Sequence, residues 1–180
     1  MKAKLKTNIF LIGFMGAGKS TVSRKMARVC GCESLDVDFY IERMTGMRIA
    51  EIFADYGESM FRKIETDALT EIVQFCQSRI ISCGGGIIVT PENIEIMKNN
   101  GCVVHLYSDA INGAKRISNK SSRPLFKDVE SAQKRFEERL PFYEKAADIT
   151  IDTTNNSSKA VTRYVIDALV KAGKLEILEG

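Results

Sequence analysis

The stretch that most constrains this chain is GFMGAGKS at residues 13–20, which directly follows the apolar run Ile9–Ile12. It fits the pattern G-x-x-x-x-G-K-[ST], in which a glycine-rich loop joins a buried strand to a helix. In such a loop the backbone N–H groups turn inward around an anion, and the positive end of the helix dipole adds to the attraction. The sequence therefore predicts a phosphate-binding loop and a chain that binds a nucleoside triphosphate.

Each part of the loop has an expected task. The backbone N–H groups from Gly16 through Ala17 and Gly18 to Ser20 would surround the phosphates. Lys19 would reach the β and γ phosphates, and the Ser20 hydroxyl would ligate Mg²⁺. The alternative interpretation is a tight turn between strand and helix with no ligand.

Composition excludes several other classes of protein. A chain of 180 residues suits one compact domain. A net charge of +3 is too small to indicate a nucleic-acid or membrane-surface partner. No apolar stretch reaches transmembrane length or forms a signal peptide, so we expect a cytoplasmic protein. The five cysteines lack zinc-ribbon pairs and are expected to be reduced, and the single histidine, His105, is expected in the core.

Strand-like and helix-like segments alternate along the chain. A helix is expected at residues 19–30, another from Thr90 onward, and a last one capped by Ser157 or Ser158. The apolar face of that last helix would comprise Val161, Tyr164, Val165, Ala168 and Leu169. Strands are expected at residues 7–12, 33–36, 79–82, 102–107 and 148–152. This order predicts an α/β fold with a parallel sheet covered by helices on both faces.

Two segments interrupt this alternation. Residues from about 37 to 76 are helical for longer than one crossover needs, which predicts an inserted helical subdomain. Residues 115–127 are polar, basic and aperiodic, which indicates a loop. We therefore expect one domain over residues 1–180, with a core formed by residues 1–36, 77–114 and 127–180 and a lid at about 115–126.

The segments after the second and third strands carry candidate groups for an acceptor. Asp36 and Asp38 come at the end of a strand, where ligands gather in open α/β sheets. With strand alternation both carboxylates would point the same way, one toward Mg²⁺ and one toward an acceptor hydroxyl. A helix cap would explain either aspartate alone. The three consecutive glycines at residues 84–86 leave room for a ring-shaped substrate against the backbone.

A predicted helix supplies a cation for the acceptor. Arg62 is able to bind a carboxylate bidentately, and Glu65 lies three residues on, on the same helical face. An arginine on a helix is more often exposed to solvent. The combination with the aspartates and the glycines favours a role in binding substrate.

Together these motifs resemble the shikimate kinase family. The matching stretches are GFMGAGKS, LDVD followed by Ile41 and Glu42, IFADYGESMFRKIE, SCGGG, SSRPL and RLPFYEKAADITIDT. They occur in the family's order and cover most of residues 8–153. The resemblance implies a three-layer α/β/α P-loop fold with a central five-stranded parallel sheet. It also implies ATP-dependent phosphorylation of the 3-hydroxyl of shikimate, in aromatic amino-acid biosynthesis.

The resemblance further implies a set of site residues. ATP contacts are implied for Gly16, Ala17, Gly18, Lys19, Ser20, Thr21, Arg116 and Arg123. Shikimate contacts are implied for Asp38, Phe53, Phe61, Arg62, Glu65, Gly84, Gly85, Gly86 and Arg139. Mg²⁺ is implied at Ser20 and, through water, at Asp36.

Within this set, Lys19, Asp38 and Arg123 match the catalytic positions. Asp38 matches the aspartate that hydrogen-bonds the acceptor hydroxyl and serves as a base. Arg62 and Arg139 match the pair that binds the shikimate carboxylate, with Phe53 and Phe61 as apolar walls and Glu65 orienting its neighbours. Arg123 matches an arginine of the lid, and Arg116 matches one that stacks near adenine.

Two other functions remain open at this point. A kinase of the same fold that acts on gluconate or a nucleoside monophosphate would keep the loop but change the acceptor pocket. A nucleotide-dependent regulatory module would be expected to lack one of the catalytic groups. We expect a monomer that binds shikimate and ATP, with neither nucleic acid nor membrane as a partner.

Overall fold

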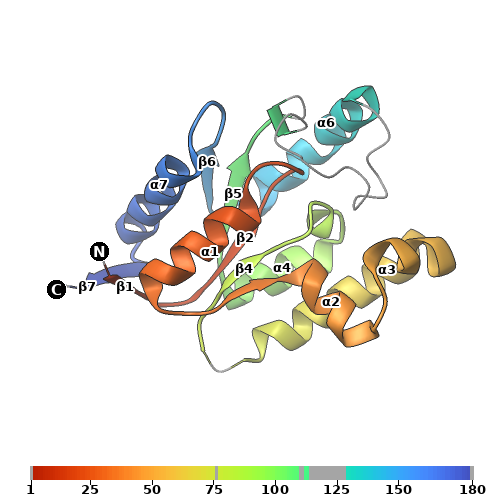
Figure 1. The fold of residues 1–180 in the computed structure, drawn as a ribbon, viewed down its shortest axis with the longest axis horizontal. Helices are drawn as coiled ribbons and strands as arrows, with labels where there is room; N and C mark the ends of the chain where they lie inside the picture. Colours follow the sequence, from red (N-terminus) through yellow and green to blue (C-terminus); the bar gives the residue numbers. More distant parts are fainter. Residues whose placement is uncertain (1, 76, 110–111, 114–128, 179–180) are drawn as a thin grey trace.

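A five-stranded sheet runs through the computed structural model, which describes residues 2–75, 77–109, 112–113 and 129–178, and helices cover both of its faces (Figure 1). All neighbouring strands of this sheet are parallel. In spatial order they are β3 (Ser34–Asp36), β4 (Ile80–Ser82), β2 (Asn8–Ile12), β5 (Gly101–Tyr107) and β6 (Ile149–Asp152). The predicted parallel sheet is confirmed.

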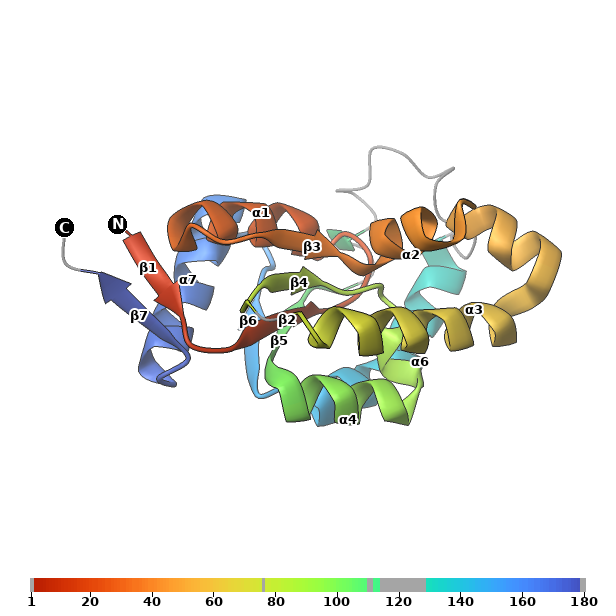
Figure 2. The same cartoon turned by 90° about the horizontal axis from the view of Figure 1, so that it is seen from below.

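The central strand β2 contributes to two separate apolar layers. Phe10 and Ile12 point to one face, while Ile9 and Leu11 point to the other, because side chains alternate along a strand. One face packs against α1 (Lys19–Cys30) and α7 (Ser158–Lys171). The other packs against α3 (Ile49–Val73), α4 (Pro91–Asn100) and α6 (Val129–Ala146). Figure 2 shows the resulting three layers edge-on.

Two helices follow β3 and extend to one side of the sheet. Asp36 caps α2 (Val37–Thr45), because its carboxylate accepts a hydrogen bond from the Phe39 N–H at 3.4 Å. α2 packs beside α3, which bends at Gly57, where φ is 77° and ψ is 175°. These two helices lie where the sequence predicted helical structure, and Figure 1 shows them on the right of the molecule.

The chain termini form a small sheet that the sequence did not predict. β1 (Lys2–Leu5) pairs antiparallel with β7 (Leu175–Leu178), with Ala3 and Leu175 buried. A short 3₁₀ helix, η1 (Ile87–Val89), follows the glycine triplet and was also not predicted. The residues of the expected lid at 115–126 lie outside the described residues.

Helix ends and faces agree with the sequence in most details. Ser157 caps α7 by accepting a hydrogen bond from the Ala160 N–H at 3.2 Å. Thr90 occupies the cap position of α4 but makes no side-chain cap bond. Tyr164 is 46% exposed, so its placement on the apolar face was wrong, and Ile166 is buried instead. The buried stripe of α7 runs through positions 161, 162, 165, 166 and 169, which leaves position 164 on the solvent side.

His105 is 1% exposed, as predicted for a core histidine. Within the described part of the chain, no helix combines the length and apolar character needed to cross a membrane.

Candidate active site

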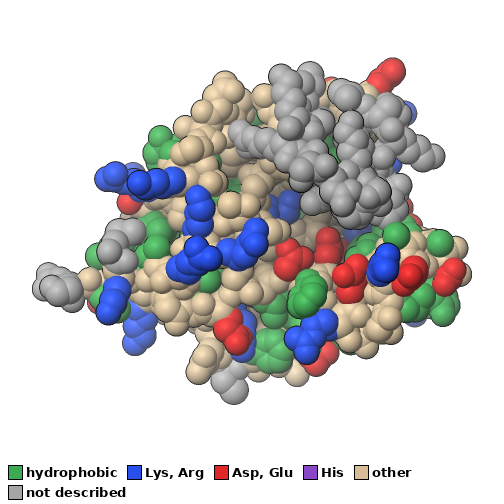
Figure 3. Space-filling view, viewed as in Figure 1, with side chains coloured by type: hydrophobic (Ala, Val, Ile, Leu, Met, Phe, Trp, Pro, Cys, Tyr) green, Lys and Arg blue, Asp and Glu red, His purple; other side chains and the backbone are tan. Residues whose placement is uncertain are grey.

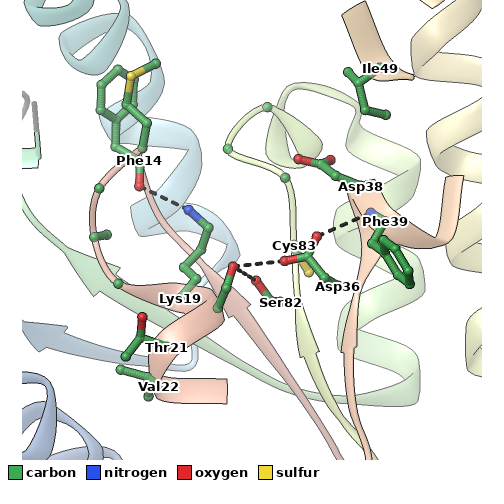
Figure 4. A pocket seen from close by; sticks show the side chains of 18 of the residues that line it. Phe14, Lys19, Thr21, Val22, Asp36, Asp38, Phe39, Ile49, Ser82 and Cys83 are labelled. Carbon is green, nitrogen blue, oxygen red and sulfur yellow. Dashed lines mark hydrogen bonds between the residues drawn. The ribbon is translucent and has the colours of Figure 1, made fainter. Parts of the chain in front are cut away.

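The glycine-rich loop joins the end of β2 to the start of α1. Gly16 and Gly18 have φ values of 76° and 91°, in the left-handed region that favours glycine. Lys19 is the first residue of α1 and is only 8% exposed. Its Nζ donates to the carbonyl oxygen of Gly13 at 2.7 Å. It also donates to the carbonyl oxygen of Phe14 at 3.0 Å (Figure 4). A positive charge is thus held beside a helix N-terminus, an arrangement that favours binding of an anion.

Three side-chain oxygens meet beside the start of α1. The Ser20 hydroxyl donates to an Asp36 carboxylate oxygen at 2.9 Å and lies 3.2 Å from the Ser82 hydroxyl (Figure 4). Asp36 and Ser82 are register partners at the carboxyl ends of β3 and β4. Asp36 therefore both caps α2 and faces Ser20, so the capping interpretation is confirmed, and the metal-ligand interpretation stays a prediction. The sequence analysis did not identify Ser82.

Asp38 reaches the site by a different route from the one expected. β3 ends at Asp36, and Asp38 lies in the first turn of α2, so the argument from strand alternation was wrong. The cap at Asp36 starts the helix immediately after the strand. The Asp38 carboxylate still lies close to Gly84, where an added Cβ would be 2.8 Å from Oδ1.

Arg62 lies between two carboxylates on α3. Its guanidinium donates to Glu65 at 2.7 Å and to Glu58 at 2.9 Å. The Arg62 side chain is 14% exposed and the Glu65 side chain is fully buried, so Arg62 is not a solvent-exposed surface arginine. Burial raises the pKa of Glu65 to about 7; Arg62 opposes this shift, whereas the negative charge of Asp38 adds to it.

The glycine triplet after β4 lets side chains approach the backbone closely. A Cβ at Gly86 would be 2.4 Å from a nitrogen of the Arg62 guanidinium. The Cβ at Gly84 would also lie 3.1 Å from a carboxylate oxygen of Glu65. Residues with side chains at these two positions would displace the charged groups, which explains why glycine is needed here.

Helix α6 is hydrogen-bonded to the same glycine triplet. The carbonyl oxygen of Gly85 accepts hydrogen bonds from the Tyr143 hydroxyl and, at 3.3 Å, from Arg139. Tyr143 is fully buried and stacks on His105 with a centroid distance of 4.9 Å. Tyr143 was not among the predicted site residues, although it follows Arg139 by four positions and so shares its helical face.

The glycine-rich loop, Asp36, Asp38, Arg62, Glu65, Ser82, the glycine triplet and Arg139 line one cavity of about 1000 Å³. Every predicted site residue within the described ranges is part of its lining, including Thr21 and the wall formed by Phe53 and Phe61, whose rings lie 4.6 Å apart. Arg116 and Arg123 lie outside the described residues. Figure 3 shows the hollowed face, with acidic side chains gathered over α2 and α3. Arg135 also lines the cavity and was not predicted.

This arrangement defines a class of enzyme. One half of the cavity has a phosphate-binding loop with side-chain oxygens beside it. The other half has carboxylates and guanidinium groups. Together the two halves suit phosphoryl transfer to a small anionic acceptor. The fold has three layers around a parallel sheet, and together with this site it is that of a P-loop kinase.

Comparisons with known proteins identify the family. The sequence model of the family "Shikimate kinase" matches residues 15–170. A shikimate kinase of Dehalococcoides mccartyi is 42% identical over 170 residues, covering 93% of this chain and 96% of that protein. The solved shikimate kinase from Acinetobacter baumannii in complex with shikimate has a TM-score of 0.87 and 34% identity, covering 92% of this chain and 94% of that chain. This chain therefore belongs to the shikimate kinase family, whose reaction is phosphorylation of shikimate with ATP.

A more distant structure shows how far the fold alone extends. A gluconokinase from Sinorhizobium meliloti has a TM-score of 0.61 at 14% identity, over 94% of each chain. This likeness concerns the fold, and it does not identify the acceptor.

Proposed function

We propose that the cavity is where this chain transfers the terminal phosphoryl group of Mg²⁺–ATP to the 3-hydroxyl of shikimate. The observation that carries the proposal is the convergence of Lys19, Asp38 and Arg62 on one cavity. The glycine-rich loop lies on one side of that cavity and Asp38 on the other (Figure 4). A donor and an acceptor held on these two sides would be close to each other, which lowers the entropic cost of the reaction.

The acceptor half suits a carboxylated ring. Arg62 and Arg139 would bind the shikimate carboxylate, and the glycine triplet would lie against the ring. Phe53 and Phe61 would form an apolar wall. Glu65 would fix the orientation of Arg62, because its fully buried carboxylate accepts a hydrogen bond of 2.7 Å from the guanidinium.

The transfer itself would rely on two described residues. Asp38 would accept a hydrogen bond from the 3-hydroxyl and take its proton as the oxygen attacks phosphorus. Lys19 would leave the loop carbonyls to stabilise the negative charge that spreads over the phosphoryl oxygens. Arg123 is proposed as a further cation over the phosphates and Arg116 as the adenine contact; both positions rest on the sequence.

The oxygen groups beside the loop suit Mg²⁺. Ser20 would hold the ion through its hydroxyl and Asp36 through water, since hydroxyl, carboxylate and water oxygens are the hard ligands that Mg²⁺ prefers. When bound with ATP, Mg²⁺ would neutralise phosphate charge during the transfer. The Ser20–Asp36 hydrogen bond of 2.9 Å supports this assignment, because it holds the hydroxyl and carboxylate oxygens next to each other.

Two broader features of the protein are also proposed. We propose a monomeric enzyme, since a chain of 180 residues is long enough to close an active site alone. All cysteines of the described part are free thiols, which suits the reducing environment of the cytoplasm.

The experiment that tests the function is an ADP-release assay of the purified protein with Mg²⁺–ATP. Shikimate, gluconate and AMP are each supplied as sole acceptor, beside a control without acceptor. We expect turnover with shikimate only. Turnover with another acceptor would keep the phosphate-binding loop and overturn the acceptor pocket, and ATP binding without any turnover would indicate a regulatory module.

A further inference from the structure

Arg135 is a residue of α6 that lines the cavity. It comes one helical turn before Arg139 and two turns before Tyr143, so the three side chains share a helical face. Arg139 and Tyr143 both donate to the carbonyl oxygen of Gly85, which fixes the helix against the glycine triplet. Arg135 therefore lies about 6 Å farther along the same face. It lines the same cavity as Arg139.

In the described part of the chain, Arg62 has carboxylate partners and Arg139 has none. Glu58 and Glu65 both pair with Arg62. Within the described ranges, Arg139 forms no ion pair and uses one N–H group on the carbonyl of Gly85, although a guanidinium carries five donors. Burial lowers the pKa of Arg139, and the positive charges of Arg62 and Arg135 lower it further. Arg62 and Arg135 thus both lie close enough to Arg139 to repel it, and an anion beside Arg139 would relieve that repulsion.

We propose that Arg135 is a third substrate-binding arginine, which contacts the carboxylate of the acceptor together with Arg139. The inference rests on the proposed function and adds a residue to its acceptor site. Arg135 neighbours Arg139, which is proposed to bind the carboxylate, whereas Lys19 is proposed to bind the phosphates and Ser20 to hold Mg²⁺. A carboxylate accepts hydrogen bonds at two oxygens, so guanidinium groups one turn apart are able to share it.

The test compares Arg135→Gln with Lys134→Gln. Lys134 is exposed on the same helix and loses the same charge, so it controls for the net charge of α6. The dissociation constants of shikimate and of its methyl ester are measured by calorimetry, and KM and kcat by ADP release. We expect Arg135→Gln to weaken shikimate binding about tenfold or more, with kcat and the KM for ATP nearly unchanged. Its affinity for the ester should match that of the wild type.

The control and a conservative variant sharpen the result. Lys134→Gln should bind shikimate as the wild type does. Arg135→Lys should recover part of the lost affinity, because a lysine restores the charge but not the planar fork. A role in packing alone would weaken the binding of the acid and of the ester equally, so the ester separates it from a contact to the carboxylate.

Three outcomes would overturn the inference. One is an unchanged shikimate affinity in Arg135→Gln. Another is an equal loss for the acid and the ester, which would mean that the carboxylate is not the contact. The third is a rise in the KM for ATP without a change for shikimate. Failure of the proposed function would be visible separately, because the wild-type protein would then not turn over shikimate.

Discussion

Gly16 and Gly113 pack backbone against backbone. A Cβ atom on Gly16 would lie 2.1 Å from the carbonyl oxygen of Gly113, and one on Gly113 would lie 2.4 Å from the carbonyl oxygen of Met15. Gly113 follows β5, and its N–H donates to the carbonyl of Asp109 at 2.9 Å. Because backbone atoms do not move aside as a flexible side chain does, the position of the glycine-rich loop depends on the segment after β5.

Replacing Gly113 by alanine should therefore disturb nucleotide binding. We expect Gly113→Ala to weaken ATP binding by at least about tenfold, since the loop must shift to make room. The free energy of unfolding should fall by about 1–3 kcal/mol, as for other overpacked sites. Titration calorimetry with ATP and urea unfolding would measure the two effects.

A suitable control is Gly46→Ala. Gly46 has a φ of 70° and no atoms within 4 Å of an added Cβ, so alanine there introduces backbone strain without a clash. This variant should lose about 1 kcal/mol of stability and keep its ATP affinity. Equal ATP affinities for Gly113→Ala and the wild type would contradict the proposed dependence of the loop on Gly113.

Local patterns in the sequence were enough to predict the sheet and the loop. The motif that ends in Lys19 and Ser20 fixes a strand, a turn and a helix within a few residues of one another. The five strands of the parallel sheet were predicted to within one residue at each end, whereas the terminal strands β1 and β7 were missed. Resemblance to the family then supplied the site residues that local patterns do not connect.

The features that were missed depend on contacts between distant segments. Ser82 meets Ser20 only because β4 lies beside β2 and β3, and no local pattern shows that order. Arg135 and Tyr143 depend on how α6 is placed against the glycine triplet. The exact position of Asp38 depends on a cap, and Asp36 is equally able to end a strand or begin a helix.

Arg62→Ala should weaken the binding of shikimate by roughly 2 to 4 kcal/mol, because the ion pair between the Arg62 guanidinium and the shikimate carboxylate is lost. ATP affinity should stay the same. Stability should also fall, because the buried Glu65 loses the partner that lies 2.7 Å away. Lys63→Ala changes an exposed neighbour on the same helix and should alter none of these quantities. If calorimetry found the same shikimate affinity in Arg62→Ala as in the wild type, the carboxylate contact would be misassigned.

Asp38→Asn should lower kcat by about 10²- to 10⁴-fold, because an amide cannot take the proton of the acceptor hydroxyl. Calorimetry should show ATP binding close to that of the wild type. Asp55→Asn removes an exposed carboxylate from the neighbouring helix α3 and serves as the control, with normal turnover expected. A kcat for Asp38→Asn within a few-fold of the wild type would rule out a role as base.

Glu65 should make the stability of the ligand-free protein depend on pH. Burial, with help from the charge of Asp38, raises its pKa to about 7 from an ordinary value of 4.5. Between these two pH values the folded protein holds a proton that the unfolded chain releases. The contribution of Glu65 to the free energy of unfolding is therefore fully present below about pH 4.5 and is lost as the pH rises through about 7.

The variant Glu65→Gln lacks this titration, so its stability should fall less than that of the wild type between pH 5 and pH 8. We expect the difference between the two proteins to change by about 1–3 kcal/mol over that range, measured by urea unfolding. Glu95→Gln, an exposed change on α4, should follow the wild type at both pH values. Parallel pH profiles for the wild type and Glu65→Gln would mean that Glu65 stays ionised in the folded protein, held so by Arg62 and Arg139.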